Sequence, residues 1–229
     1  MRRFLACSLA VAVFPALAAP AAAETREDEQ VWVNLTAMGP IAGDAVYFAE
    51  VQPRMGDGAS RLDQLLLRGA IGLKLSPAVT LYQGYAHIVV PVDGGRDVNE
   101  ERSFQQLGWF MGKPWGGELS SRTRLEQRWR SDGGDTGWRL REMLRYEKPL
   151  KPGTNTVNAL VYAEGFLALN DTDWGARGGF DQLRSFVGVE LGVKDATTVE
   201  LGYLNQVIDQ TRGRTRMNHV ASVSLFFRH

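Results

Sequence analysis

Cysteine is nearly absent from this sequence of 229 residues, because the single one, Cys7, lies close to the N-terminus. No second cysteine is present to form an intramolecular disulfide, so stability must come from packing, from a closed sheet or from a membrane. Lys and Arg equal Asp and Glu at 26 each, so the chain lacks the cationic excess that nucleic-acid binding requires. Beyond the N-terminal segment no run of about 18 apolar residues exists, which excludes membrane-spanning helices. A membrane β-barrel stays possible, because its alternating strands contain no such run.

The N-terminal segment has the pattern of a secretory signal peptide. Arg2 and Arg3 are followed by an apolar stretch from Phe4 to Leu17, and small residues end at Ala23. This pattern predicts cleavage after residue 23 and export. We therefore expect a cleaved signal peptide over residues 1–23, followed by a single domain over residues 24–229 that contains no cysteine.

The rest of the chain predicts β-strands nearly throughout. Segments of alternating apolar and polar residues are separated by clusters of Gly, Pro, Asp and Asn. Short connections (76–78, 113–115, 194–196) alternate with longer polar ones (92–99, 131–136, 170–179, 209–216), as in outer-membrane barrels. The predicted segments are 30–38, 45–53, 64–76, 79–90, 100–111, 118–130, 137–147, 156–168, 180–193, 197–208 and 217–227.

The alternation places charged side chains on one face of each predicted strand. In segment 118–130, Arg122, Arg124, Glu126, Arg128 and Arg130 share a face, because a strand repeats every two residues. Segment 137–147 opposes arginines to apolar residues in the same way, although Glu142 interrupts its apolar face. A soluble sandwich also alternates, but its wet face would carry more lysine. Arginine with glutamate suits a confined lumen in which the charges pair, so we favour a barrel whose interior is filled by side chains.

Two further patterns support a barrel of consecutive strands. Segments 68–85 and 184–203 repeat one design, in which an arginine, a turn and a Gly-Tyr pair follow in order. Aromatic residues on the apolar face are expected to form interfacial girdles near the strand ends. The residues assigned to these girdles are Tyr85, Trp109, Trp129, Trp138, Tyr146 and Tyr203.

The number of segments conflicts with the even strand count of bacterial barrels, because there are eleven of them. We expect about 10–12 strands in an all-β, transmembrane, antiparallel up-and-down barrel whose two ends both face the periplasm. If segment 30–38 does not span the membrane, the barrel has ten strands. If one further strand has no recognisable pattern in the sequence, it has twelve. Pro53, which ends segment 45–53 early, makes this region the least regular.

Several short motifs follow one another in order along nearly the whole chain after the signal peptide. They are Glu101-Arg102 through Gln106, Arg122-x-Arg124-Leu125-Glu126-Gln127-Arg128, Arg139-Leu140-Arg141, Glu164-x-Phe166, Phe180-Asp181-Gln182-x-Arg184, Glu200-Leu201-Gly202-Tyr203 and Asn218-His219. With these motifs the chain resembles a family of bacterial outer-membrane barrels known as domain of unknown function 2490. The resemblance implies an outer-membrane β-barrel, but it supplies no ligand and no reaction.

The sequence offers little for catalysis. No metal-ligand spacing and no Gly-rich phosphate loop occur, so we expect no metal, no cofactor and no enzymatic activity. A lipid-modifying barrel hydrolase would need a histidine and a serine on one strand face. His219 is separated by odd intervals from Ser222 and Ser224, which places them on opposite faces of a regular strand.

The candidate site is the charged lumen. The lumen could pass or bind a small anion. Alternatively, its arginines and glutamates could only pair with one another and fill the barrel as a rigid plug, and we favour this structural role. The loop residues Asp171, Asp173 and Trp174 are a weaker candidate for a surface ligand site. The lumen residues are Arg102, Arg122, Arg124, Glu126, Arg128, Arg139, Arg141, Arg145, Glu164, Arg184, Glu190 and Glu200.

These patterns predict an outer-membrane protein whose partners are outer-membrane lipid, the barrel-assembly machinery and a small anionic solute, and not nucleic acid. Two alternatives remain, a lipid-modifying barrel hydrolase and a periplasmic β-sandwich binding protein.

Overall fold

The structure, a computed structural model, describes residues 25–151, 157–194, 196–210 and 213–229. The predicted signal peptide lies outside the described residues, as do Asp195 and part of the predicted loop 209–216. Among the described residues no helix is long and apolar enough to cross a membrane. One short 3₁₀ turn, η1, covers Pro114–Gly116. The strands are β1 (Thr25–Ala42), β2 (Ala45–Gly56), β3 (Arg61–Ser76), β4 (Val79–Val90), β5 (Val98–Gly112), β6 (Glu118–Arg130), β7 (Gly137–Lys151), β8 (Val157–Ala168), β9 (Gly179–Lys194), β10 (Thr197–Gln210) and β11 (Arg214–Arg228).

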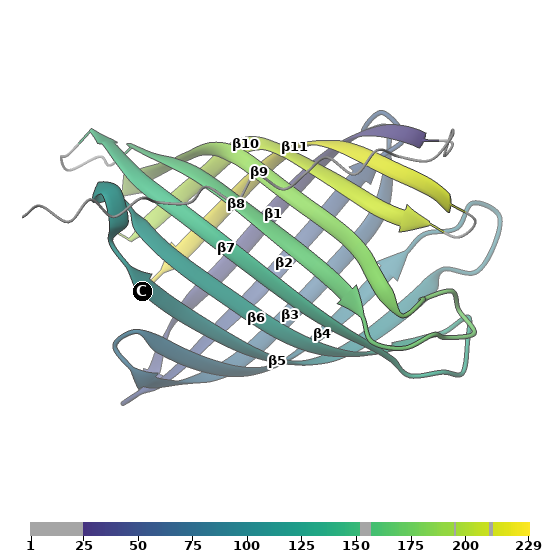
Figure 1. Cartoon of the computed structure of the whole chain (residues 1–229), viewed down its shortest axis with the longest axis horizontal. Helices are drawn as coiled ribbons and strands as arrows, with labels where there is room; N and C mark the ends of the chain where they lie inside the picture. The colour runs from purple at the N-terminus through teal and green to yellow at the C-terminus, as the bar shows by residue number, and fades with distance from the viewer. Residues whose placement is uncertain (1–24, 152–156, 195, 211–212) are drawn as a thin grey trace, which may run out of the picture.

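These strands form one closed barrel in which each strand pairs with its neighbours in sequence (Figure 1). Ten of the strand pairs are antiparallel, and the barrel closes through a parallel pairing of β1 with β11, from Thr25 opposite Thr215 to Met38 opposite Arg228. Closure leaves no unpaired sheet edge among the described strands. The prediction of a barrel is therefore confirmed, and the alternative of a β-sandwich is wrong.

The expected even strand count is wrong, because segment 30–38 lies within β1, the longest of the described strands, and pairs on both sides. Strand β2 also continues past Pro53 to Gly56. Pro53 pairs with Leu65 of β3, and the pairing between β1 and β2 skips it, passing from Val51 to Arg54. Its missing N–H therefore falls at a gap in the ladder, where proline is tolerated.

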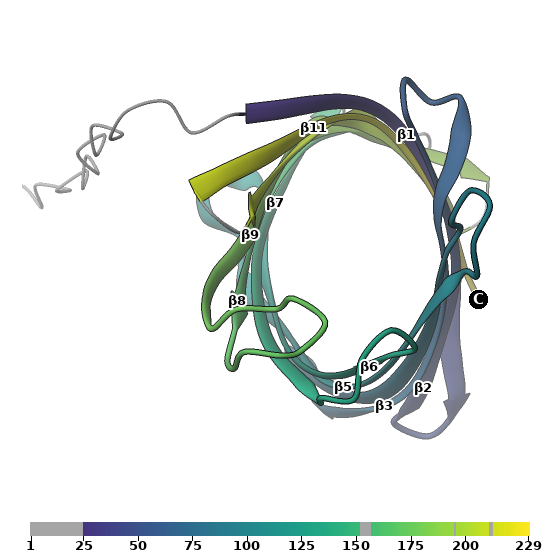
Figure 2. The ribbon, with the colours of Figure 1, turned by 90° about the vertical axis from the view of Figure 1, so that its right-hand side faces the viewer.

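An odd number of strands places the two ends of the described chain at opposite rims. Thr25 begins β1 at the rim that carries loops 91–97, 131–136 and 169–178, here called the long-loop rim, and Figure 2 looks along the barrel from this side. Arg228 ends β11 at the other rim, which carries turns 43–44, 77–78 and 113–117 and is here called the short-turn rim. The expectation that both ends share one side is therefore wrong, because a parallel closing pair makes β1 and β11 run in the same direction.

Inside the barrel, apolar side chains gather on two sides. One cluster comes from β2–β5 and the other from β1 and β8–β11, which leaves β6 and β7 to supply charged residues between them. The first cluster consists of Phe48, Leu66, Ala70, Ala86, Ile88 and Phe104, and the second of Trp32, Leu160, Phe186, Leu204 and Val220.

Glycines make room for the aromatic rings in these clusters. A Cβ on Gly84 would lie 2.1 Å from the ring of Phe104, and one on Gly202 would lie 2.5 Å from the ring of Phe186. These are the glycines of the two Gly-Tyr pairs, so the repeated hairpins β3–β4 and β9–β10 share a physical reason for their common motif. Each glycine lets a ring from an adjacent strand fill the lumen.

The outward aromatic residues only partly follow the predicted girdles. Trp109, Trp129 and Trp138 are exposed near strand ends. Tyr85 and Tyr203, however, lie at the middles of β4 and β10, so their assignment to strand ends is wrong. Their hydroxyl groups have hydrogen-bond partners on the neighbouring strands, Glu101 at 2.6 Å and His219 at 2.6 Å, so they need no interface to satisfy them.

Candidate functional site: the arginine-lined lumen

All twelve predicted lumen residues lie on inward-facing positions of their strands. In β6 the buried residues Arg124, Glu126 and Arg128 alternate with more exposed ones, and in β7 Arg139 and Arg141 do the same. The period of two in the sequence is therefore the inside–outside alternation of the barrel wall.

The carboxylate of Glu126 organises the first group of ion pairs. It accepts hydrogen bonds from Arg139 Nη2 at 2.6 Å and Nε at 2.9 Å, and from Arg141 Nη1 at 2.7 Å. Arg124 lies 3.6 Å away and also donates to Gln106 of β5. Glu126 is only 1% exposed, so these interactions form away from water.

Glu164 of β8 is the centre of the second group. Its Oε1 atom accepts from Arg141 Nη2 at 2.7 Å and from Arg122 Nη2 at 2.8 Å, and Arg184 lies 3.9 Å from its other oxygen. Arg141 thus joins Glu126 to Glu164, and the ion pairs run continuously across β6, β7 and β8.

Smaller groups extend this network to both rims. Towards the long-loop rim, Glu100 accepts two hydrogen bonds from Arg102 and one of 2.5 Å from Arg128. Towards the short-turn rim, Arg145 contacts Glu200 at 2.7 Å and Glu190 at 3.4 Å.

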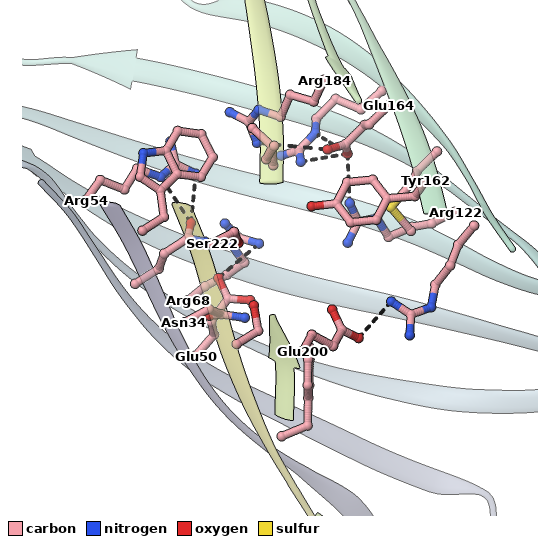
Figure 3. A pocket seen from close by; sticks show the side chains of 18 residues that line it. Asn34, Glu50, Arg54, Arg68, Arg122, Tyr162, Glu164, Arg184, Glu200 and Ser222 are labelled. Atoms are coloured by element: carbon pink, nitrogen blue, oxygen red, sulfur yellow. Dashed lines mark hydrogen bonds and ion pairs between the residues drawn. The ribbon is translucent and has the colours of Figure 1, made fainter. Parts of the chain in front are cut away.

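A cavity of about 160 Å³ lies among these side chains (Figure 3). Figure 3 shows Arg54 and Arg68 on one side of it, with Tyr162, Glu164 and Arg184 across from them. Its charged lining residues are six arginines and three glutamates, so positive charge is in excess. They are Arg54, Arg68, Arg122, Arg141, Arg145, Arg184, Glu50, Glu164 and Glu200.

Three buried polar atoms of this lining have no hydrogen-bond partner among the described residues. Two are donors, Nε of Arg122 and Nε of Arg184, and one is an acceptor, Oδ1 of Asn34. Arg54 has only neutral partners within the described residues: it donates to Gln52 and Gln64 and stacks 3.8 Å over the ring of Trp32. Hydrogen-bonding capacity therefore remains free among the side chains that line the cavity.

A second hollow, of about 420 Å³, lies at the long-loop rim and is lined by Arg128, Arg130, Arg139, Trp174 and Asp181, among others. Glu126 lies between the two hollows, since it binds both Arg139 of the rim hollow and Arg141 of the central cavity. A row of amides on β9, β10 and β11 continues this layer, where Gln206 donates to Gln182 and Asn218 donates to Gln206 at 2.9 Å. We call these residues the closing layer.

The predicted loop site has a structural role. Asp173 accepts hydrogen bonds from the backbone N–H groups of Gly134 at 2.8 Å and Asp135 at 3.2 Å, and Asp135 accepts one from the N–H of Asp173 at 2.8 Å. The N–H donors of Gly134 and Asp135 lower the pKa of Asp173 below its ordinary value. These bonds clamp loop 131–136 to loop 169–178, and Trp174 lies against Arg128 and Arg130 at the mouth of the rim hollow.

The groups considered for catalysis or metal binding are not brought together. His219 is on the outer face of β11 and bonds Tyr203, whereas Ser222 and Ser224 line the central cavity. Among the described residues no group of three or more His, Cys, Asp and Glu is arranged to hold a metal ion.

The candidate list from the sequence omitted part of the site. Glu50, Arg54 and Arg68 line the central cavity from β2 and β3, where the charged residues are widely spaced. The inward face of β2 could be recognised from the sequence, because Phe48, Glu50, Gln52 and Arg54 occupy every second position. The end of the predicted segment at Pro53 excluded Arg54, whereas Glu50 and Arg68 lie inside predicted segments and were not assigned to the lumen.

Comparison with known proteins places the chain in a family without assigning a function. The family described as "Protein of unknown function (DUF2490)" matches residues 29–218. An uncharacterized protein of Methylorubrum extorquens is 48% identical over 217 residues, which cover 93% of each chain. No solved structure matches the chain. By extent of match and by identity, this chain belongs to the DUF2490 family.

Proposed function

We propose that this protein is an outer-membrane β-barrel that binds a small oxyanion in the central cavity of a lumen closed by ion pairs. The outer surface supports membrane embedding, because large apolar side chains stand exposed on strands around the barrel. Ile71 is 66% exposed, Val187 56% and Leu144 50%. Soluble monomers rarely expose apolar surface to this extent. The predicted signal peptide supports export.

The observation that carries the proposal is the pair of unpartnered donors, Nε of Arg122 and Nε of Arg184, in a cavity where arginines outnumber glutamates. A buried N–H without a partner costs free energy, and an anion in the cavity would remove that cost while balancing the charge. Guanidinium groups are suited to this because their donors match the geometry of carboxylate and phosphate oxygens.

The unpartnered acceptor, Oδ1 of Asn34, narrows the class of anion. An amide oxygen needs a donor, and a fully deprotonated anion has none. Hydrogen phosphate keeps a proton near neutral pH and could satisfy both kinds of atom, whereas sulfate could satisfy only the arginines. We therefore expect phosphate to bind more tightly than sulfate.

Binding is favoured over free passage because the cavity is small and the closing layer separates it from the rim hollow. A volume of about 160 Å³ holds roughly five water molecules. The ion pairs of Glu126 and the amide row of Gln182, Gln206 and Asn218 lie between the two hollows. The absence of catalysis remains a prediction.

The test of anion binding is calorimetric titration of the folded barrel in detergent with inorganic phosphate, with Arg54→Gln as the variant. Arg54 has neutral partners, so its removal leaves no carboxylate without its basic partner. Loss of one charge-assisted contact, worth about 1.5–3 kcal/mol, should weaken phosphate binding roughly 10- to 100-fold. Arg130→Gln, which removes the same charge at the rim, is the control and should bind phosphate normally. Equal affinities for both variants, or no binding by the unmodified chain, would refute the proposal.

The location is tested separately by membrane fractionation and by migration on a gel before and after boiling. We expect the chain in the outer-membrane fraction, with a band that shifts on heating. Recovery as a soluble periplasmic protein would contradict membrane embedding whatever the result of the titration.

A further inference from the structure

The outer face of the barrel is not uniformly apolar. Three consecutive outward positions are polar on β4 and three on β5, whereas on β6 the polar positions are interrupted by Leu125. On β7, Glu142 stands between the outward residues Leu140 and Leu144. On β8, by contrast, Val161, Ala163 and Leu167 occupy outward positions. We call the polar group on β4–β7 the outer polar band. It consists of Gln83, Tyr85, His87, Glu101, Ser103, Gln105, Ser121, Thr123, Gln127 and Glu142.

Hydrogen bonds connect the centre of the outer polar band. Gln127 donates to Gln105 at 3.0 Å, Gln105 donates to Gln83 at 2.8 Å, and Gln83 donates to Ser103 at 3.1 Å. Each carboxamide has two N–H donors and an oxygen with two lone pairs, so these bonds use only part of its capacity. The centre of the band therefore still offers both donors and acceptors to the outside.

Each end of the band carries one carboxylate, and the two carboxylates have different partners. At the β4–β5 end, Glu101 accepts from His87 Nδ1 at 2.7 Å and from Tyr85. Nε2 of His87 has no hydrogen-bond partner among the described residues. At the β7 end, Glu142 accepts from Ser121 and Thr123, both at 2.5 Å, and has no basic partner in the described part of the chain.

The band keeps a constant depth along the barrel axis. In Figure 1 the strands run obliquely to the barrel axis. Residues that are paired across neighbouring strands therefore lie progressively closer to the long-loop rim from β5 to β7. The band is displaced in the opposite direction along the strands. Glu142 is paired through Thr123 and Leu107 with Leu81 of β4, whereas the band on β4 is centred on Tyr85, which is nearer to the long-loop rim. For strands tilted by about 40°, side chains stay at one depth only if they shift by roughly one residue along each successive strand. The displacement from Leu81 to Tyr85 over three strand boundaries agrees with this requirement.

We propose that the outer polar band is the interface of a homodimer in the membrane, an inference that rests on the proposed membrane location. Lipid chains offer no hydrogen-bond partners, so polar groups at membrane depth are best satisfied by protein. A two-fold axis along the membrane normal superposes a band of constant depth on its own copy. Carboxamides that both donate and accept are complementary to themselves.

The same axis pairs the unlike ends of the band. It sets β4 of one copy against β7 of the other, so Glu142 of each copy meets the Tyr85–His87 end of its partner. When the imidazole of His87 is protonated, its Nε2 also carries a hydrogen and can donate to the carboxylate of Glu142 across the interface. This pairing of the ends, together with the self-complementary carboxamides at the centre, favours a second copy of the chain over an unrelated partner.

The test is oxidative cross-linking of single cysteines in native membranes. Cys7→Ser provides a cysteine-free background. Gln105→Cys lies beside the expected axis, and Val161→Cys on β8 is a matched outward control. We expect a disulfide-linked dimer from Gln105→Cys and only monomer from Val161→Cys. Monomer from both, or cross-linking of Gln105→Cys to a different protein, would overturn the homodimer.

A second variant tests whether the polar groups hold the dimer. Gln105→Leu combined with Gln127→Leu should leave a monomer in detergent that still shifts on heating, whereas Asn205→Leu on β10 should leave the dimer intact. A dimer that survives the double substitution would refute the role of the band. A heat-modifiable monomer for the unmodified chain would refute the dimer alone, while a soluble chain would refute the membrane location as well.

Discussion

Glu126 shows at the scale of one residue how the lumen is held together. Three arginines from β6 and β7 surround its carboxylate, and it is almost fully buried. In such a site the charges are mutually dependent, because removing one partner leaves the others buried without compensation.

Neutralising this carboxylate should therefore be costly. Glu126→Gln is expected to lower the free energy of unfolding by about 3–5 kcal/mol, because Arg139 and Arg141 keep their charges. Glu118→Gln on the same strand removes an exposed pair with Lys113 and should cost less than about 1 kcal/mol. Urea unfolding of the folded barrel measures both variants, and equal losses would contradict the central role of Glu126.

A second residue-scale prediction concerns the glycines beneath the lumen rings. Gly84→Ala places a methyl group against the ring of Phe104 and should destabilise the barrel by about 1–3 kcal/mol. Gly165→Ala, where a Cβ would meet no atom within 4 Å, is the control and should be tolerated. The temperature at which the gel band shifts compares the two variants, and a tolerated Gly84→Ala would contradict the packing described.

Sequence predicts single residues well wherever period two is visible. The arginines and glutamates of β6 and β7 could be assigned to the lumen because neighbours in a strand face opposite sides. Their partners could not be assigned, because the pairing of Arg122 with Glu164 spans two strand boundaries and depends on register. The outer polar band was visible only as the interruption of the apolar face by Glu142.

At the scale of elements, the two long loops form a clamp of their own. Asp173 and Asp135 exchange hydrogen bonds with each other's loop, and Trp174 lies over two arginines at the rim. The sequence showed acidic loop residues but not this reciprocal pairing, since the loops are separated by β7 and β8.

The clamp should open in acid. The pKa of Asp173 is lower in the folded chain, so its bonds stabilise the clamp fully above the ordinary value of 3.8 and are lost as pH falls through the lower folded value. Asp173→Ala should open the clamp at any pH. Amide hydrogen exchange at Gly134 and Asp135 measures this, with the β6 amides as an internal control. Protection of those two amides that is unchanged in Asp173→Ala would contradict the clamp.

At the scale of the whole molecule, the parallel closure of β1 with β11 has a topological consequence. Strands joined in sequence alternate in direction, so eleven of them start and finish at opposite rims. The sequence contained all eleven segments, but the rule of even strand counts argued against them. No local residue pattern signals a parallel closing pair, because it is set by the number of strands.

This topology makes a prediction about labelling in intact cells. In the cysteine-free background, Arg26→Cys and Arg228→Cys lie at opposite rims. An impermeant thiol reagent should modify one of them and spare the other until the outer membrane is permeabilised. Equal labelling of both in intact cells would contradict an odd-stranded barrel that spans the membrane.

Oxyanion binding in the central cavity can be tested by a crystal structure of the barrel with arsenate, a phosphate analogue whose heavy atom scatters X-rays anomalously. We expect an anomalous peak in the central cavity, within hydrogen-bond distance of Nε of Arg122 and Nε of Arg184. A central cavity without a peak, or a peak confined to the rim hollow near Arg130, would contradict this binding.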